Sequence, residues 1–277
     1  MAQILSRTLG DADLIVLTDG TLEFDREIFP GTDPAHIDAL LDAAGEEAIR
    51  TNFNAVLIRR PGQTILVDSG PRDLFGPTAG HLPEALAEAG TAPEEVDLIF
   101  LTHLHPDHIA GTVTPDGQPV FPNAEMVIPA AEIAFWSDAA RFAGDETLSG
   151  WQQLAAAVLA AYEGRIRTVT DSDEIAPGMT ALPLPGHTPG HSGFRLDVGD
   201  ESFVHAADIV HAQALQLADP DVGVVFDVDA DTARASRKRL LDMLATDGIR
   251  FSGGHILRPA FGHVERANGG YRFVDEA

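Results

Sequence analysis

The stretch that decides the fold is Leu101-Thr102-His103-Leu104-His105-Pro106-Asp107-His108, which follows the largely apolar residues 96–100. We expect residues 96–102 to form a buried strand, so the histidines stand where that strand ends. Neutral imidazole and carboxylate groups are ligands that suit zinc, and also iron or manganese. An unpaired polar group beside a buried strand would be costly. The stretch therefore favours a metal site over a solvated loop.

The spacing within this stretch favours two ions over one. His103 and His105 are two positions apart, so their side chains point the same way in an extended segment. Pro106 then forces a turn, after which Asp107 and His108 can face a second ion beside the first. We therefore expect a dinuclear centre.

The pattern His-x-His-x-Asp-His after a strand resembles the signature of the metallo-β-lactamase-fold hydrolases. Further motifs resemble that family in the expected order: Gly186-His187-Thr188-Pro189-Gly190-His191, then Asp208 after the strand-like residues 202–207, then Gly253-Gly254-His255. The resemblance covers nearly the whole chain. It implies an α/β (α+β) fold, a four-layer αββα sandwich, as a single hydrolase domain over residues 1–277.

The resemblance also implies which residues hold metal. The expected set is His103, His105 and His187 on one ion, Asp107, His108 and His255 on the other, and Asp208 bridging both. Two divalent ions are expected, zinc first, with manganese, iron or cobalt as alternatives. The chain contains no cysteine, so it departs from the β-lactamases of this fold that use a thiolate ligand.

Some histidines compete for the same roles. Proximity alone does not choose between His187 and His191, and His255 and His263 both lie in a glycine-rich stretch. The family pattern selects His187 and His255, which leaves His191 and His263 as supporting groups. Asp68 follows an apolar strand and resembles the acid that orients a ligand imidazole in this family.

Within the superfamily, the chain is more similar to the branch that contains methyl parathion hydrolase and the quorum-quenching lactonases. The similarity rests on residues 67–70, 74–78, 121–124, 135–136 and 270–274. It implies a hydrophobic substrate pocket with Phe75, Trp136 and Trp151 at its mouth, and core packing is the alternative for each ring. His211 stands where such lactonases often place a tyrosine that steadies the substrate carbonyl, so a catalytic donor role is a hypothesis.

The implied activity is metal-dependent hydrolysis. A hydroxide between the ions attacks a carbonyl or phosphoryl centre, and Asp107 returns a proton to the leaving group. A lactone or ester is the first expectation for the substrate, and an organophosphate triester is the second. A β-lactamase or a thioesterase would use the same water. A metal-binding protein without catalysis would need a blocked bridging position, which nothing in the sequence indicates.

The composition limits the partners. The formal charge is −25, from 43 acidic and 18 basic residues, and the only basic cluster is Arg237-Lys238-Arg239. Such a charge disfavours nucleic acid and anionic membrane surfaces. A small, apolar, neutral substrate is expected, and a homodimer stays open. Residues 1–7 lack a long apolar region, so we expect a cytoplasmic protein, with a processed secreted form left open.

Hydrophobic periodicity and turn residues predict the order of elements. Residues 52–59 and 64–68 form a hairpin around Pro61-Gly62. Three helices are expected at residues 82–89, 145–162 and 229–245. Strands are expected at residues 166–169, 180–184, 193–198, 202–207 and 249–252. Each expected ligand then lies just beyond a strand or a turn, where a rigid scaffold presents functional groups.

Overall fold

Two seven-stranded sheets make up the centre of the computed structural model, which describes residues 3–257 and 261–276. The first sheet contains, in spatial order, β1 (Gln3–Leu9), β2 (Ala12–Phe24), β3 (Ile49–Arg60), β4 (Gln63–Val67), β5 (Leu98–Phe100), β6 (Glu125–Pro129) and β7 (Ile166–Val169). The second contains β14 (Gly270–Asp275), β13 (Gly262–Ala267), β12 (Arg250–Ser252), β11 (Glu201–His205), β10 (Ser192–Val198), β9 (Met179–Pro183) and β8 (Glu174–Ala176). The strands of residues 3–169 therefore build the first sheet, and those of residues 174–275 build the second.

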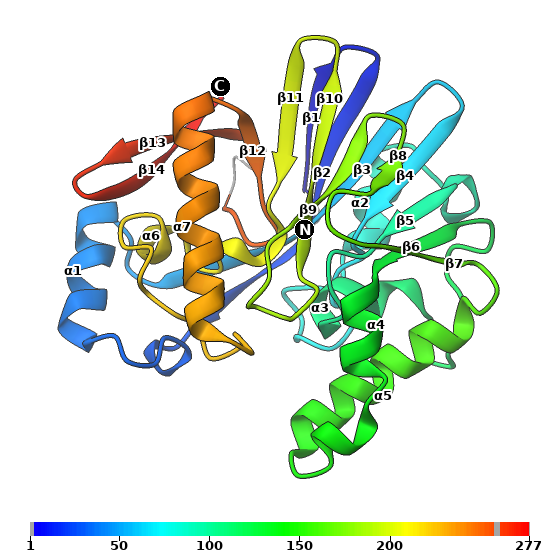
Figure 1. Ribbon diagram of the computed structural model, residues 1–277, viewed down its shortest axis with the longest axis horizontal. Helices are drawn as coiled ribbons and strands as arrows, with labels where there is room; N and C mark the ends of the chain where they lie inside the picture. The colour runs from blue at the N-terminus through cyan, green and yellow to red at the C-terminus, as the bar shows by residue number, and fades with distance from the viewer. Residues whose placement is uncertain (1–2, 258–260, 277) are drawn as a thin grey trace.

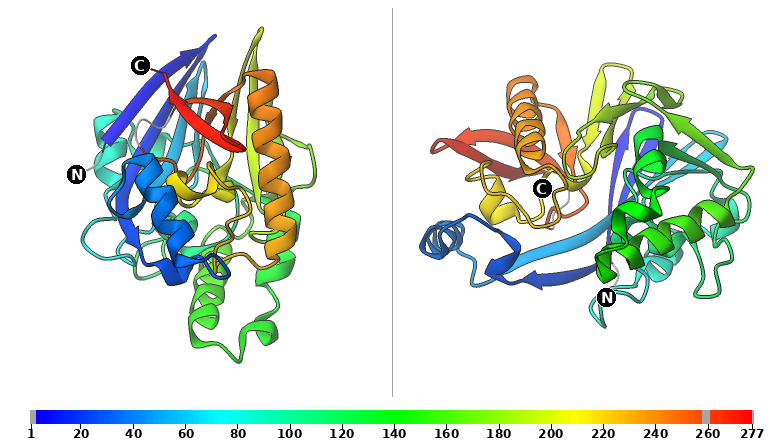
Figure 2. Two further views of the ribbon diagram at one scale, coloured as in Figure 1. Left: turned by 90° about the vertical axis from the view of Figure 1, so that its left-hand side faces the viewer. Right: turned by 60° about the horizontal axis from the view of Figure 1, so that its bottom comes forward.

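Helices cover the outer faces of both sheets (Figures 1 and 2). They are α1 (Pro34–Ala44), α2 (Leu82–Glu88), α3 (Pro106–Ile109), α4 (Ala130–Trp136), α5 (Glu146–Ala161), α6 (Gln213–Gln216) and α7 (Ala230–Asp247). Leu86 of α2 and Val158 of α5 belong to the apolar cluster on the first sheet. Leu241 of α7 packs in the cluster on the second sheet, with Val204 and Phe251. The expected αββα sandwich is confirmed.

The strand β3 shows why its sequence is apolar without a break. Successive side chains of a strand point to opposite faces. Ala55 and Leu57 accordingly join the cluster beneath the helices, whereas Val56 and Ile58 join the cluster between the sheets, with Phe203 of β11. A strand that is buried on both faces therefore has no solvent side on which polar residues are favoured.

Capping residues fix the two long helices where the sequence predicts them. The Asp145 carboxylate accepts a hydrogen bond from the Leu148 N–H at the start of α5. Asp229 does the same for the Thr232 N–H at the start of α7, and Gly248 ends α7 at φ +63°. These are the usual devices at helix ends. The hairpin of β3 and β4 is confirmed as well.

Some predicted boundaries are wrong. β5 spans only Leu98–Phe100, because the Thr102 N–H donates to the Asp68 carboxylate at 2.9 Å and so leaves the strand pattern. β11 ends at His205, two residues early, because Ala207 adopts φ +46°. The basic stretch 237–239 lies on α7, but Arg237 is buried, so the three cations form no common surface patch. Within the described residues, no helix is long and apolar enough to cross a membrane.

Candidate metal centre

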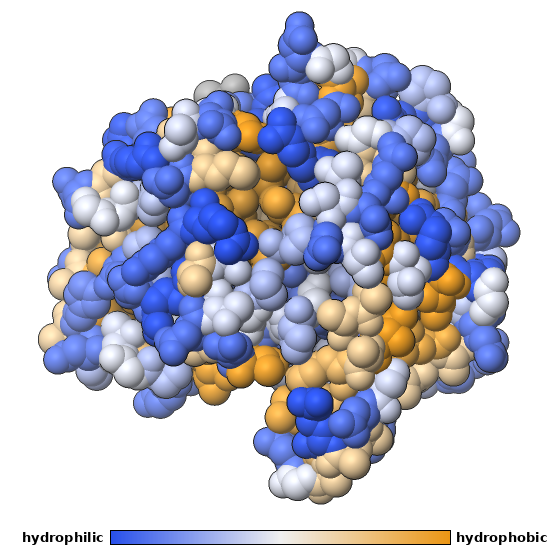
Figure 3. All heavy atoms as spheres, viewed as in Figure 1, coloured by the Kyte–Doolittle hydropathy of each residue, from blue (hydrophilic) through white to orange (hydrophobic). Residues whose placement is uncertain are grey.

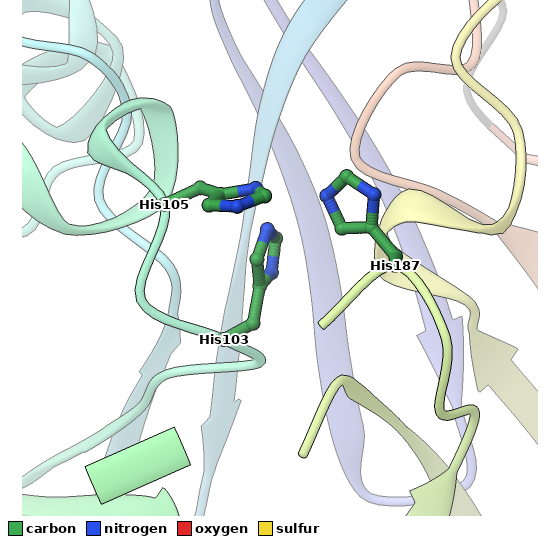
Figure 4. Close-up of side chains that lie close together, drawn as sticks. All are labelled: His103, His105 and His187. Carbon is green, nitrogen blue, oxygen red and sulfur yellow. The ribbon is translucent and has the colours of Figure 1, made fainter. Parts of the chain in front are cut away.

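The predicted ligands meet at one edge of the sandwich, on loops and short helical turns that follow strands. His103 and His105 come directly after β5, and His187 lies beyond β9. Figure 4 shows His103 and His105 approaching from one side and His187 from the other, with their rings converging. Asp208 follows β11, and His255 follows β12. The order of the strands in the two sheets thus brings these residues together, although they lie far apart in the sequence.

These residues form two neighbouring clusters. One nitrogen each from His103, His105 and His187 lies within 4.8 Å of the other two, and all three side chains are buried. The ring centroids of His105 and His187 are 4.6 Å apart. A second cluster with the same spacing limit comprises Asp107, His108, Asp208 and His255. These two clusters match the groups that the family resemblance implies. Asp208 also lies within the same limit of His103 with His191, and of His187 with His211.

Asp208 lies between the two clusters. Its Oδ2 atom is 3.3 Å from Nε2 of His187 and 3.6 Å from Nε2 of His103. The same oxygen is 3.0 Å from Nε2 of His255, and Oδ1 is 3.1 Å from Nε2 of His108. One carboxylate therefore reaches members of both clusters.

The polar atoms at the centre fit a bound metal. Among the described residues, Nε2 of His103, His108 and His187 and Oδ1 of Asp208 are buried without a hydrogen-bond partner. Buried polar atoms in folded proteins are almost always partnered, because leaving them unpaired is costly. Lone pairs on imidazole and carboxylate that converge in this way are the donor set of a divalent ion such as zinc. A cation at each cluster would satisfy them.

Asp68 orients two of these imidazoles. Its Oδ2 atom accepts a hydrogen bond from Nδ1 of His108 at 2.9 Å. The Thr102 hydroxyl also donates to Oδ2, at 2.8 Å, and lies 3.0 Å from Nδ1 of His103. Because these hydrogen bonds hold each Nδ1, each Nε2 faces the centre. Partners outside the ligand set commonly orient imidazoles at metal sites in this way. Asp68 has φ +59°, an uncommon value for a residue with a Cβ atom.

Other outer partners were not predicted from the sequence. Nδ1 of His255 lies 2.7 Å from the carbonyl oxygen of Asn52. Nδ1 of His187 lies 3.0 Å from Oδ1 of Asp227, whose Oδ2 is 3.7 Å from the buried guanidinium of Arg237. A backbone carbonyl leaves no signal in a sequence. The acid at 227 does leave one, because it interrupts an apolar run.

The two histidines that were predicted to support the site, His191 and His263, lie in different places. His191 accepts a hydrogen bond from the Asp208 N–H at 3.0 Å, and its Nδ1 lies 2.7 Å from the Leu184 carbonyl oxygen. Both of its nitrogens therefore have partners within the protein, which agrees with the predicted supporting role. His263 is partly exposed and pairs with Glu276 at 3.2 Å. The expectation that His263 supports the site is wrong, because β13 carries it to the surface.

Burial and charge divide the imidazoles into two electrostatic kinds. Burial holds the pKa of His103 and of His105 well below the usual value, so both rings are neutral at pH 7. Burial also lowers the pKa of His187, but the Asp208 and Asp227 carboxylates outweigh it and raise the pKa to about 9. A metal must therefore displace a proton from His187, whereas His103 and His105 already offer lone pairs.

Two cavities adjoin the centre. A narrow chamber of about 40 Å³ lies over the clusters, and Phe75, Trp151 and Phe226 are among the residues that line it. A larger cavity of about 540 Å³ lies beyond, with Trp136, Trp151, Phe226 and Leu148 in its wall. Trp151 and Phe226 line both. Figure 3 shows apolar side chains at the lower edge, near where the segment before α7 faces the projecting end of α5.

The three predicted pocket aromatics therefore lie in different places. Phe75 lines only the chamber and Trp136 only the larger cavity, whereas Trp151 lies between the two. Trp136 is almost completely buried, and its Nε1–H donates to Glu132 at 3.0 Å. Phe226, which the sequence did not single out, stands 6.5 Å from Trp151, measured between ring centroids.

Comparisons with known proteins agree with this arrangement. The family model of the metallo-beta-lactamase superfamily matches residues 50–255. The crystal structure of a hydrolase called AbOPH, in the beta lactamase superfamily, is 30% identical with a TM-score of 0.94, covering 100% of this chain and 98% of that one.

A second solved structure is AidC, a dizinc quorum-quenching lactonase in complex with a product, N-hexanoyl-L-homoserine. It is 27% identical with a TM-score of 0.91, and the coverage is again 100% and 98%. The anti-Pycsar protein Apyc1 of Saccharibacillus brassicae is 27% identical over 62% of this chain. The match spans 66% of the length of Apyc1, slightly less than two thirds.

Proposed function

The chain belongs to the metallo-beta-lactamase superfamily, and from that premise we propose that it is a hydrolase of lactones or esters that uses two divalent metal ions. The observation that carries the proposal is the pair of buried clusters with Asp208 between them and with unpartnered Nε2 atoms turned inward. A site that held only one ion would leave one of these clusters unsatisfied.

In this proposal the ligands divide as the clusters do: His103, His105 and His187 for one ion, Asp107, His108 and His255 for the other, and Asp208 for both. When bound, two such ions lower the pKa of a shared water and polarise the substrate oxygen. Zinc suits imidazole and carboxylate ligands. The similarity to AidC, a dizinc lactonase, supports zinc here.

The side chains around the chamber supply the proton transfers. Burial alone would raise the pKa of Asp107, but His108 and His255 hold it below its usual value, so the carboxylate is ionised. Asp107 also lines the chamber, so in this proposal its carboxylate takes up the proton that the attacking water gives up there. It returns this proton to the leaving oxygen when the carbon–oxygen bond of the ester breaks.

His211 serves as a neutral hydrogen-bond donor in this proposal. Its Nε2 atom lies 3.3 Å from Oδ2 of Asp208, and its side chain is buried. Burial lowers the pKa of His211 to about 4, so its ring is uncharged at pH 7. An uncharged imidazole has one N–H, so His211 would steady a substrate carbonyl in the tautomer whose N–H points into the chamber that it lines, and not in the one whose N–H is held by Asp208.

The larger cavity indicates a substrate with an apolar arm. The ester group would lie in the narrow chamber, and the arm would lie in the space of about 540 Å³ beyond it, against Trp151 and Phe226, which line both. Burying each methylene there contributes about 0.8 kcal/mol. A neutral, apolar substrate also suits a chain of formal charge −25. The product bound to AidC, an acylated homoserine, has this two-part form.

A substrate panel on enzyme of defined metal content tests this function. The panel contains an acylated homoserine lactone, an aryl ester, a phosphotriester, a thioester and a β-lactam. The proposal expects the highest kcat/KM for the lactone or the ester, and none of these activities after the metal is removed. A preference for the phosphotriester would favour the second candidate of the sequence analysis, and hydrolysis that persists without metal would contradict both.

Replacing Trp151 tests the apolar arm. Trp151→Ala should lower the ratio of kcat/KM between a long-chain and a short-chain lactone by about tenfold, since apolar contact is lost only for the longer chain. Metal content should be unchanged. Tyr271→Ala, which removes a partly buried ring from the cluster under α7, is the matched control and should leave the ratio alone. An unchanged ratio in Trp151→Ala would mean that this ring is only core.

A further inference from the structure

A single buried carboxylate connects the two segments that carry the first metal cluster. Glu132 on α4 is completely buried and accepts four hydrogen bonds. Its Oε2 atom accepts from the Leu104 N–H at 3.0 Å and from Nε1–H of Trp136 at 3.0 Å. Its Oε1 atom accepts from the Thr188 hydroxyl and from the Gly190 N–H at 2.8 Å.

The donors to Glu132 lie next to the histidines of the first cluster in the sequence. Leu104 stands between His103 and His105, and Thr188 directly follows His187. One carboxylate oxygen therefore holds the segment of the first two imidazoles, and the other oxygen holds the segment of the third. From this geometry we propose that Glu132 is a positioning residue, which sets the distance between these segments and so the geometry of the first cluster.

Gly190 gives independent evidence that its segment packs very closely against α4 at Glu132. A Cβ atom at this position would lie 2.6 Å from the Glu132 backbone nitrogen and 3.0 Å from its Cγ atom. Real Cβ atoms are not found at the shorter of these distances, so only glycine allows α4 to come this near. The glycine of the segment and the acid of the helix thus belong to one arrangement.

The inference rests on the proposed metal centre, and its test measures metal binding. In Glu132→Gln one carboxylate oxygen becomes an amide NH₂, which cannot accept a hydrogen bond. Whichever way the amide turns, it faces two donors on one side. One of the two ligand segments must therefore lose its support, although the side chain keeps its size.

The experiment titrates metal-free parent and variant with Co²⁺, and then with Zn²⁺, and follows the ligand-field spectrum of cobalt. Glu132→Gln should weaken the binding constant of the first cluster about tenfold or more, as the loss of an outer partner does. The constant of the second cluster should stay within about twofold of the parent, and the cobalt spectrum of the first site should change. Thr188→Val, which removes one donor and keeps the carboxylate, should give a smaller change of the same kind.

Asp19→Asn is the matched control. Asp19 is also a completely buried carboxylate, and it accepts hydrogen bonds from the Gly80 and Leu82 N–H groups and from none of the segments that carry His103, His105 and His187. It packs against Gly70, two residues after Asp68 on the side of the second cluster. Its loss should lower the melting temperature and leave the metal constant and the cobalt spectrum of the first cluster alone. If Glu132→Gln behaves like this control, Glu132 is merely structural and the inference is overturned. If Glu132→Gln does not fold, Thr188→Val decides, and parent-like constants and spectrum in it overturn the inference.

The proposed function and the role of Glu132 can fail separately. A parent protein that binds no metal overturns the proposed function and this inference together. A parent that binds two ions, with unchanged constants in Glu132→Gln and Thr188→Val, overturns this inference alone.

Discussion

Asp208→Ala is expected to lose more than about 100-fold in kcat/KM and to retain less metal than the parent. The magnitude follows because losing an outer partner of a ligand already costs about 10- to 100-fold. Asp208 is more central, since its two oxygens lie within 3.6 Å of Nε2 atoms from both clusters. Its removal would also leave neighbouring imidazoles without the charge that balances them.

The comparison for Asp208→Ala is His205→Ala on the adjoining strand. His205 is completely buried, its ring stacks on that of Phe194 at 5.6 Å, and it belongs to neither metal cluster. Its loss should reduce the melting temperature and spare metal content. Steady-state kinetics and elemental analysis of both variants decide the matter. Parent-like activity in Asp208→Ala would remove this residue from the site.

Asp227→Asn is expected to weaken metal binding at the first cluster about tenfold, and Asp227→Ala about 100-fold. The Asp227 carboxylate is buried and holds Nδ1 of His187 at 3.0 Å, which aims Nε2 at the centre. Asparagine keeps an oxygen for this bond but loses the charge, whereas alanine loses both and leaves Arg237 without its nearby carboxylate, 3.7 Å away.

The pH dependence of this loss has a definite sign. In the parent, the raised pKa of His187, about 9, means that a proton competes with the metal at pH 7. Removing the carboxylate lowers that pKa and weakens this competition. The affinity ratio of parent to Asp227→Asn should therefore increase as the pH rises from 7 towards 9. A ratio that falls over this range would contradict the role given to Asp227.

Asp229→Asn is the control for this pair of variants. Asp229 is exposed and caps α7 through the Thr232 N–H. Its replacement should cost at most about 1 kcal/mol of stability, as changes at such caps do. Metal affinity should stay the same at every pH. Equal losses of affinity in Asp227→Asn and Asp229→Asn would mean that the whole segment, and not one carboxylate, supports His187.

The clusters could be predicted from the sequence because their chemistry is concentrated in short motifs. Four of the donors lie within residues 103–108, where residue type and spacing are enough to indicate metal. The supporting groups have no such pattern. Asp227 and Glu132 are single acids among 43, and only the folded chain brings them to His187 and to Leu104.

The fold was predictable to a similar degree, and for a physical reason. The caps of α5 and α7 are local signals, so both helices could be placed. Six strands are not predicted from the sequence: β1, β2, β6, β8, β13 and β14. Between the last two, Asn268 and Gly269 form the turn, with positive φ at both residues. Asn-Gly is a strong hairpin signal. Residues 263–267 contain only one large apolar residue, Val264, however, and therefore lack the apolar alternation that predicts a strand.

The metal content of the parent protein tests the central claim most directly. The chain is purified, stripped with a chelator, reconstituted with zinc, manganese or cobalt, and freed of excess metal before elemental analysis. Two buried clusters that share Asp208 predict close to two ions per chain. A content of one ion or none after every reconstitution would contradict the dinuclear centre.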